Sequence, residues 1–171
     1  MIKSIGVIVL VLILNILTCY GAEETFRSLE YGFSIDYPKE LKIIAYDIDS
    51  VLGMDEPVLD TYISNTMDVL IGVMERNNRA LDDFLLMAQS KYEEENNITY
   101  LGFGEMEING SRAISMDSLV DFEDGLRVRD IFIESEDKVY MISCRAMDSK
   151  FKRVNQTYFQ KMIMSFRTWP I

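Results

Sequence analysis

Four strand-like runs in the second half of the chain, joined by very short gaps, constrain the fold more than any other feature. The runs cover residues 100–108, 112–122, 126–134 and 139–146. The gaps between them contain Asn109-Gly110, Glu123-Asp124-Gly125 and Ser135-Glu136-Asp137. Asn-Gly is the strongest two-residue signal for a hairpin, because both positions of a type I′ turn need a positive φ. Such gaps are too short for a parallel crossover, so the runs predict a four-stranded antiparallel meander.

Further strands and two helices surround this meander in the sequence. Strands are expected at residues 31–38, 41–46, 58–64 and 68–76. The apolar period then changes from two to 3.6, which predicts a helix from about residue 79 to 95 with Asn78 as its N-cap. A second helix near the C-terminus would begin at Asn155, again as the N-cap. The order predicts an α+β fold with an antiparallel sheet, the meander plus the N-terminal strands, and two main helices, either one on each face of the sheet or both on one face.

Residues 1–21 have the pattern of an export signal: Lys3, then a mostly apolar stretch, then a small-residue cleavage site. Three fates remain open. The segment is cleaved after Gly21, or it is a lipoprotein signal with Cys19 as the lipidated residue, or it stays as an uncleaved anchor. In each case residues 22–171 form one exported domain, secreted or tethered at the cell surface. Membrane association is expected only through the N-terminal segment.

Composition removes several classes of function. The chain has no histidine, so Ser-His and Cys-His nucleophile pairs are excluded, and no catalytic or cofactor motif stands in their place. The net charge of −11 argues against nucleic acid as a partner, since binding depends on basic residues that neutralise phosphates. Cys144 would be the one cysteine left after processing, so no internal disulfide is expected, and its place on a strand face predicts burial.

Several other residues are candidates for sites. Asp47, Asp49 and Asp55 lie in an acidic stretch that offers oxygen ligands to calcium, although the spacing does not match an EF-hand loop. Asn97 and Asn109 each begin an N-glycosylation pattern, and Asn97, just past the helix, is the better placed. The same pattern begins at residue 155, where we expect the side chain to be occupied as the helix cap. Across the second hairpin, the strand pattern allows ion pairs of Arg127 and Arg129 with Asp117 or Asp121.

Two short segments resemble the PsbP-like family of exported or lumenal domains. Residues 31–38 read Tyr-Gly-Phe-Ser-Ile-Asp-Tyr-Pro, which is similar to the opening strand of the family, and residues 162–166 are similar to its closing helix. The resemblance implies an antiparallel sheet sandwiched by helices over about residues 26–167. The role of the best-known member, an extrinsic subunit of the photosynthetic oxygen-evolving complex, is not carried over. The tryptophan that often follows the opening Tyr-Pro is absent here, with Leu41 nearby instead.

These observations predict a non-enzymatic, extracytoplasmic PsbP-like domain that serves as a binding or accessory protein at the cell surface. The expected partner is an unknown protein of the cell envelope, engaged through the sheet face or an edge strand. The alternative is an exported protein that binds a small ligand or calcium through the acidic 47–60 loop. A convergent pocket of perturbed carboxylates would instead favour an enzyme.

Overall fold

The computed structural model describes residues 23–39, 44–47, 67–121 and 124–170. The strands are β1 (Glu23–Ser28), β2 (Phe33–Pro38), β3 (Ile44–Asp47), β4 (Met67–Glu75), β5 (Ile98–Ile108), β6 (Ser111–Val120), β7 (Leu126–Glu134), β8 (Lys138–Met147) and β9 (Arg167–Thr168). The helices are α3 (Leu81–Glu94), α4 (Asp148–Val154), the π-helical turn η1 (Asn155–Phe159) and α5 (Gln160–Ser165).

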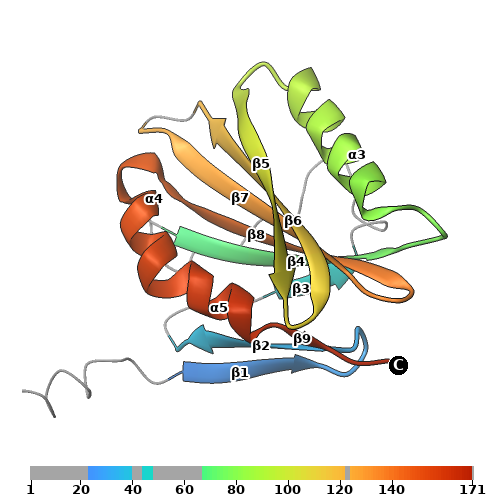
Figure 1. The fold of residues 1–171 in the computed structure, drawn as a ribbon. Coiled ribbons are helices and arrows are strands. Elements are labelled where there is room, and N and C mark those ends of the chain that lie inside the picture. The colour runs from blue at the N-terminus through green and yellow to red at the C-terminus, as the bar shows by residue number, and fades with distance from the viewer. Residues whose placement is uncertain (1–22, 40–43, 48–66, 122–123, 171) are drawn as a thin grey trace, which may run out of the picture.

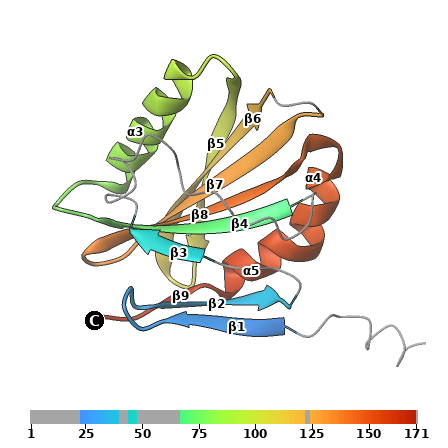
Figure 2. The same cartoon turned by 180° about the vertical axis from the view of Figure 1, so that it is seen from behind.

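The strands form two sheets. The larger sheet has the order β3-β4-β8-β7-β6-β5, and the smaller one has the order β1-β2-β9. Helix α3 covers one face of the larger sheet, whereas α4, η1, α5 and the small sheet lie on the other side (Figures 1 and 2). The predicted α+β class with sandwiching helices is confirmed. One pair departs from the antiparallel expectation, because β3 runs parallel to β4 at the edge.

The meander forms as the turn residues predicted. Asn109 and Gly110 have φ values of 51° and 86°, so both positions are left-handed, as a type I′ turn requires. Strands β5 to β8 pair in sequence, each with its neighbour and all antiparallel. The register shifts once, between Tyr100 and Gly102 of β5. Along β6, β7 and β8 the unbroken pairing fixes which side chains face α3 and which face α5.

An aromatic cluster joins the small sheet to the large one. The rings of Phe33 on β2, Tyr140 on β8 and Phe166 after α5 lie 5.3–5.7 Å apart between centroids, and all three are buried. The hydroxyl of Tyr140 also donates to the carbonyl of Tyr31 at 2.7 Å. The N-terminal hairpin and the C-terminal segment are therefore held against the sheet by one core.

Two predicted helix caps are wrong. Asn78 lies before the helix with a φ of 61°, and the N-cap position of α3 is Ala80, whose N–H donates to the Asp83 carboxylate at 2.8 Å. Asn155 lies inside a continuous helical segment that begins at Asp148. Its side chain is 9% exposed, and its Oδ1 accepts a hydrogen bond from Arg129 at 3.4 Å. That contact explains how the polar amide of Asn155 is accommodated on the buried side of the helical segment, next to Val154 and Phe159.

Other predictions on single elements have mixed outcomes. Cys144 is fully buried, as expected, and burial raises the pKa of its thiol well above the usual value. Strand β1 was not predicted from the sequence, and the predicted strand at 58–64 lies outside the described residues. No helix in the described ranges is long and apolar enough to span a bilayer.

Candidate ligand-binding pocket

A cavity of about 800 Å³ lies between α3 and the sheet face that this helix covers. Its walls come from α3, the segment after it, and strands β4 to β8. The lining residues are Leu70, Met74, Phe84, Met87, Ala88, Lys91, Tyr92, Glu94, Glu95, Asn97, Ile98, Val120, Leu126, Val128, Asp130, Phe132, Met141, Ser143 and Arg145. Small-molecule sites in proteins commonly enclose about 300–1,000 Å³, so this cavity is large enough for a ligand.

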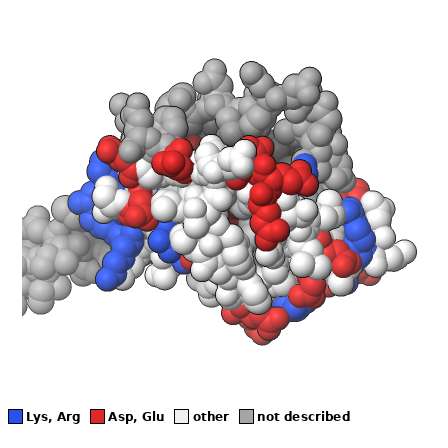
Figure 3. All heavy atoms as spheres, turned by 90° about the horizontal axis from the view of Figure 1, so that it is seen from above, with Lys and Arg blue, Asp and Glu red and all other residues white. Residues whose placement is uncertain are grey.

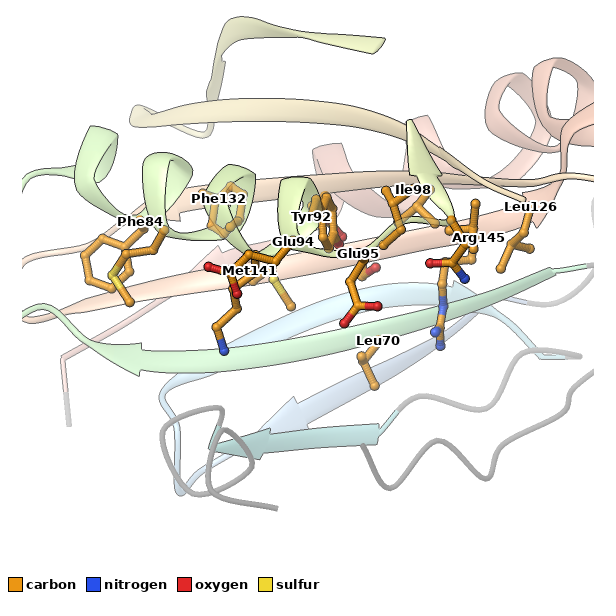
Figure 4. Close-up of a pocket in the computed structure, with 18 of the residues that line it drawn as sticks. Leu70, Phe84, Tyr92, Glu94, Glu95, Ile98, Leu126, Phe132, Met141 and Arg145 are labelled. Atoms are coloured by element: carbon orange, nitrogen blue, oxygen red, sulfur yellow. The ribbon is translucent and has the colours of Figure 1, made fainter. Parts of the chain in front are cut away.

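One end of the pocket is apolar. Figure 4 shows Phe84 and Phe132 towards this end, and Met74, Met87 and Met141 also line the cavity. Methionine side chains are flexible and polarisable, so they can adapt to ligands of different shape. The wall chemistry therefore suits an apolar body without demanding one fixed outline.

The other part of the pocket is polar and is centred on Asp130. In β7, alternation directs Val128, Asp130 and Phe132 towards α3, and Asp130 is only 1% exposed. The hydroxyl of Tyr92 on α3 donates to Asp130 Oδ2 at 2.6 Å. Asp130 Oδ1 is buried and has no hydrogen-bond partner within the part of the chain that the structure describes.

Burial raises the pKa of the Asp130 carboxyl, because taking it out of water disfavours the charged form. Neighbouring Ser143, Tyr92 and Arg145 favour the charged form, but they oppose the shift only in part. An ionised carboxylate only accepts hydrogen bonds, so Oδ1 lacks the donor that a buried acceptor normally has.

The nearby arginine is already engaged. Arg145 on β8 donates from Nε to Asp68 Oδ1 on β4 at 2.7 Å. Burial also raises the pKa of Asp68, and the charge and hydrogen bond of Arg145 partly offset that rise. Figure 4 places Arg145 beyond Tyr92, Glu94 and Glu95 when one follows the cavity away from Phe84.

Of the sites predicted from sequence that the structure describes, Asn97 is among the lining residues of the pocket, whereas Asn109 is not. Asp47 ends β3, and Asp49, Asp55 and Cys19 lie outside the described residues, so the calcium and lipidation hypotheses stay predictions. Among the described ranges, no three acidic, histidine or cysteine side chains are grouped as a metal site would require.

The two glycosylation candidates are both exposed. Asn97 follows α3, and its carbonyl accepts the N–H of Asp121 at 2.6 Å. Asn109 sits in its turn, with Nδ2 donating to the carbonyls of Met164 and Phe166 at 3.1 and 2.6 Å. A glycan at Asn109 would replace one of the two N–H groups that make these contacts, whereas the Asn97 contact uses only backbone. Glycosylation at either position stays a prediction.

The predicted ion pairs on the opposite sheet face do form. Arg129 reaches both oxygens of Asp117 at 2.7 and 2.8 Å, and Arg127 lies 3.9 Å from the same carboxylate. These side chains are half-buried, and Arg127 also lies 3.5 Å from the Asp148 carboxylate. The Nε of Arg127 is buried and has no hydrogen-bond partner among the described residues. The ion pairs stabilise the hairpin and lie on the face away from the pocket.

Sequence reasoning missed Asp130 and Tyr92. One signal was present in the sequence. Asp130 is the one acidic residue within residues 126–133, and alternation along a strand places it on the same face as Val128 and Phe132. A charged residue on the covered face of a central strand is uncommon unless it is paired. That it meets Tyr92 of a helix 38 residues earlier in the chain depends on tertiary packing.

Surface charge leaves room for an apolar contact. On the face shown in Figure 3, uncharged side chains form a broad central area, with acidic groups around it and basic groups towards the sides. Exposed large apolar residues include Phe103 on the edge strand β5, at 66%.

These features define a PsbP-like fold with a pocket between helix α3 and the larger sheet. The cyanobacterial PsbP (CyanoP) of Synechocystis sp. PCC 6803 superposes with a TM-score of 0.63 at 12% identity, covering 87% of this chain and 94% of that one. LpqN of Mycobacterium tuberculosis, described as involved in cell envelope biogenesis, gives 0.50 at 8% identity over 88% and 86%. The yeast Ran-binding protein Mog1p (Saccharomyces cerevisiae) gives 0.50 at 10% over 86% and 96%.

No protein-family model matches the chain, and no curated protein matches it in sequence. At identities of 8–12%, the structural likenesses show the fold and leave the family open.

Proposed function

We propose that this chain is a non-catalytic binding domain that holds a small amphiphilic molecule in the pocket between α3 and the sheet. The observation that carries the proposal is the cavity itself, which has a volume of about 800 Å³ and is apolar at one end. It contains a buried carboxylate, Asp130, whose Oδ1 has no hydrogen-bond partner in the part of the chain that the structure describes. Largely preformed, mostly apolar cavities with a few convergent polar groups are the usual form of ligand sites. The small-ligand hypothesis then rests on this pocket rather than on the acidic 47–60 loop, most of which lies outside the described residues.

A binding role is favoured over catalysis by the arrangement of the titratable groups. Asp130 is the one buried carboxylate that lines the cavity, and Asp68 is neutralised by Arg145. With no histidine in the chain, a base near neutral pH would have to come from these groups. A single buried carboxyl with a raised pKa is suited to accept a hydrogen bond from a ligand at least as well as to transfer a proton.

We propose further that the domain works outside the cytoplasm, in or near the cell envelope. The export pattern in residues 1–21 supports this address. The structural neighbour LpqN is itself described as involved in envelope biogenesis, which is consistent with the proposal.

The test is binding of N-phenyl-1-naphthylamine, an apolar fluorophore, to the purified protein. We expect saturable, single-site binding by the wild type and its loss in Ala88→Trp, where the added ring occupies the cavity. Ser90→Trp, on the exposed side of the same helix, is the matched control and should bind as the wild type does. Equal binding by both variants, or no saturation in the wild type, would overturn the proposal.

A protein partner is a second candidate, and the edge strand β5 favours it. This strand ends the larger sheet and exposes Leu101 and Phe103. Exposed apolar edges are common sites of strand addition. A partner from the native envelope that binds wild type but not Phe103→Asp would support this role; equal recovery by both would count against it.

A further inference from the structure

The inference drawn here rests on the proposed function and concerns the class of ligand. We infer that the pocket selects amphiphiles with a positively charged, hydrogen-bond-donating head, such as an alkylammonium, over fatty carboxylates. The unfilled acceptor Asp130 Oδ1 and the charge of the surrounding wall carry this inference together.

The first step is the hydrogen-bond inventory of Asp130. Its Oδ2 accepts from the Tyr92 hydroxyl, and a side-chain hydrogen bond from Ser143 also favours the charged form of the carboxyl. Oδ1 has no partner of hydrogen-bonding geometry among the described residues. A buried acceptor left without a donor is unfavourable, so a ligand that donates to Oδ1 gains what the protein alone lacks. An ammonium head donates and also keeps the carboxyl ionised, which gives a charge-assisted bond.

The second step is the charge of the wall. Lys91 and Arg145 are the basic residues of the lining, and Glu94, Glu95 and Asp130 are the acidic ones. The charge of Arg145 is already matched by Asp68, at 2.7 Å.

The end of α3 adds to this field. Tyr92 and Glu94 lie in its last turn, where the carbonyl groups carry the negative end of the helix dipole. A fatty carboxylate would therefore bring negative charge to a wall that already carries an excess of it. A cationic head would bring positive charge to the same wall and would be attracted to it.

The third step is the length of the apolar part. Phe84 and Tyr92, both in the lining, are about 12 Å apart along the axis of α3. A medium-length alkyl chain spans that distance, so its tail would lie against Phe84 and the methionines while its head lies near Tyr92. Figure 4 shows the same order of side chains along the cavity.

The test compares decylamine, decanol and decanoate by isothermal titration calorimetry with the purified protein at pH 7, below micelle formation. For the wild type we expect decylamine to bind about tenfold more tightly than decanol, since a charge-assisted bond is roughly twice as strong as a neutral one. Decanoate should bind most weakly.

The variant Asp130→Asn should lose the preference for the amine, with decanol binding changed by no more than about threefold. Glu93→Gln makes the same change of net charge at an exposed position of α3 outside the pocket, and it should keep the wild-type order. Thermal unfolding of both variants shows whether they are folded, and the order among ligands for the wild type tests the inference without any variant.

The outcomes separate the two proposals. If none of the three ligands binds, the proposed function fails. If all bind equally, or decanoate binds best, the pocket binds amphiphiles but the inference about the head group is wrong. If Asp130→Asn keeps the amine preference, the selectivity comes from other groups and the assignment to Asp130 is overturned.

Discussion

Replacing Asp130 with asparagine removes one ionisable group from the core and keeps the shape of the side chain. In the folded protein, burial raises the pKa of this carboxyl above the value of 3.8 that an unburied aspartate has. At a pH between 3.8 and the raised pKa, the folded protein therefore retains a proton that the unfolded chain has released. The free energy of unfolding of the wild type must then fall as the pH rises through this window.

The size of the effect follows from proton linkage. Between 3.8 and the raised pKa, the wild type loses about 1.4 kcal/mol of stability per pH unit relative to the variant, which has no proton to retain at that position. Above the raised pKa the difference is constant, so the pH at which it levels off measures the pKa of Asp130. The variant also carries an unpaired amide in place of the unpaired oxygen, a cost of about 1–3 kcal/mol that does not depend on pH.

The assay is urea denaturation of both proteins from pH 4 to pH 8, followed by circular dichroism. Other carboxyls titrate in both proteins, so they cancel in the difference. Asp68→Asn serves as the comparison variant for Asp130→Asn. It removes the charged partner of Arg145, so it should destabilise the protein near neutral pH. If the curves of wild type and Asp130→Asn run parallel, or if the wild type gains relative stability as the pH rises, the reasoning about the buried carboxyl is wrong.

Three further predictions concern the rest of the fold. Asp117→Ala leaves the guanidinium of Arg129 half-buried without its carboxylate partner and should lower the free energy of unfolding by about 1–3 kcal/mol. In the same urea assay, Glu105→Ala, which removes one partner of an exposed ion pair, should change the free energy of unfolding by no more than about 0.5 kcal/mol. Gly110→Ala should cost about 1 kcal/mol from backbone strain alone, since φ is 86° and no atom lies within 4 Å of the added Cβ; wild-type stability would contradict this. The Cys144 thiol should react with a disulfide reagent only after denaturation, because burial raises its pKa and denies access, and rapid labelling of the native protein would refute its placement.

The parts of the fold that sequence predicted best are those set by short-range rules. Asn109-Gly110 specified its hairpin because few dipeptides accept positive φ at both positions. Residues 126–134 were predicted as a strand with the bounds that β7 has. Each of these signals lies within a few residues of the structure that it specifies.

The failures lie where tertiary contacts decide between local alternatives. Asn155 has the chemistry of an N-cap, yet Arg129 supplies a hydrogen bond that lets it sit within the helix. The small sheet needs β2 to pair with β9, at Phe33 and Thr168, across almost the whole domain. The pocket depends on where α3 lies against β5, β6 and β7, which no pattern within one segment reports.

The contrast between Arg129 and Asp130 supports the proposal that the pocket binds a ligand. These neighbours on β7 point to opposite faces of the sheet. On one face, Arg129 is matched by both oxygens of Asp117. On the other face, Asp130 is more deeply buried, and one of its oxygens has no partner among the residues that the structure describes. A valine or threonine would be less costly there, so stability alone does not account for a carboxyl at that position. A ligand with a donor group does account for it, because it would complete the hydrogen bonding that the fold leaves open.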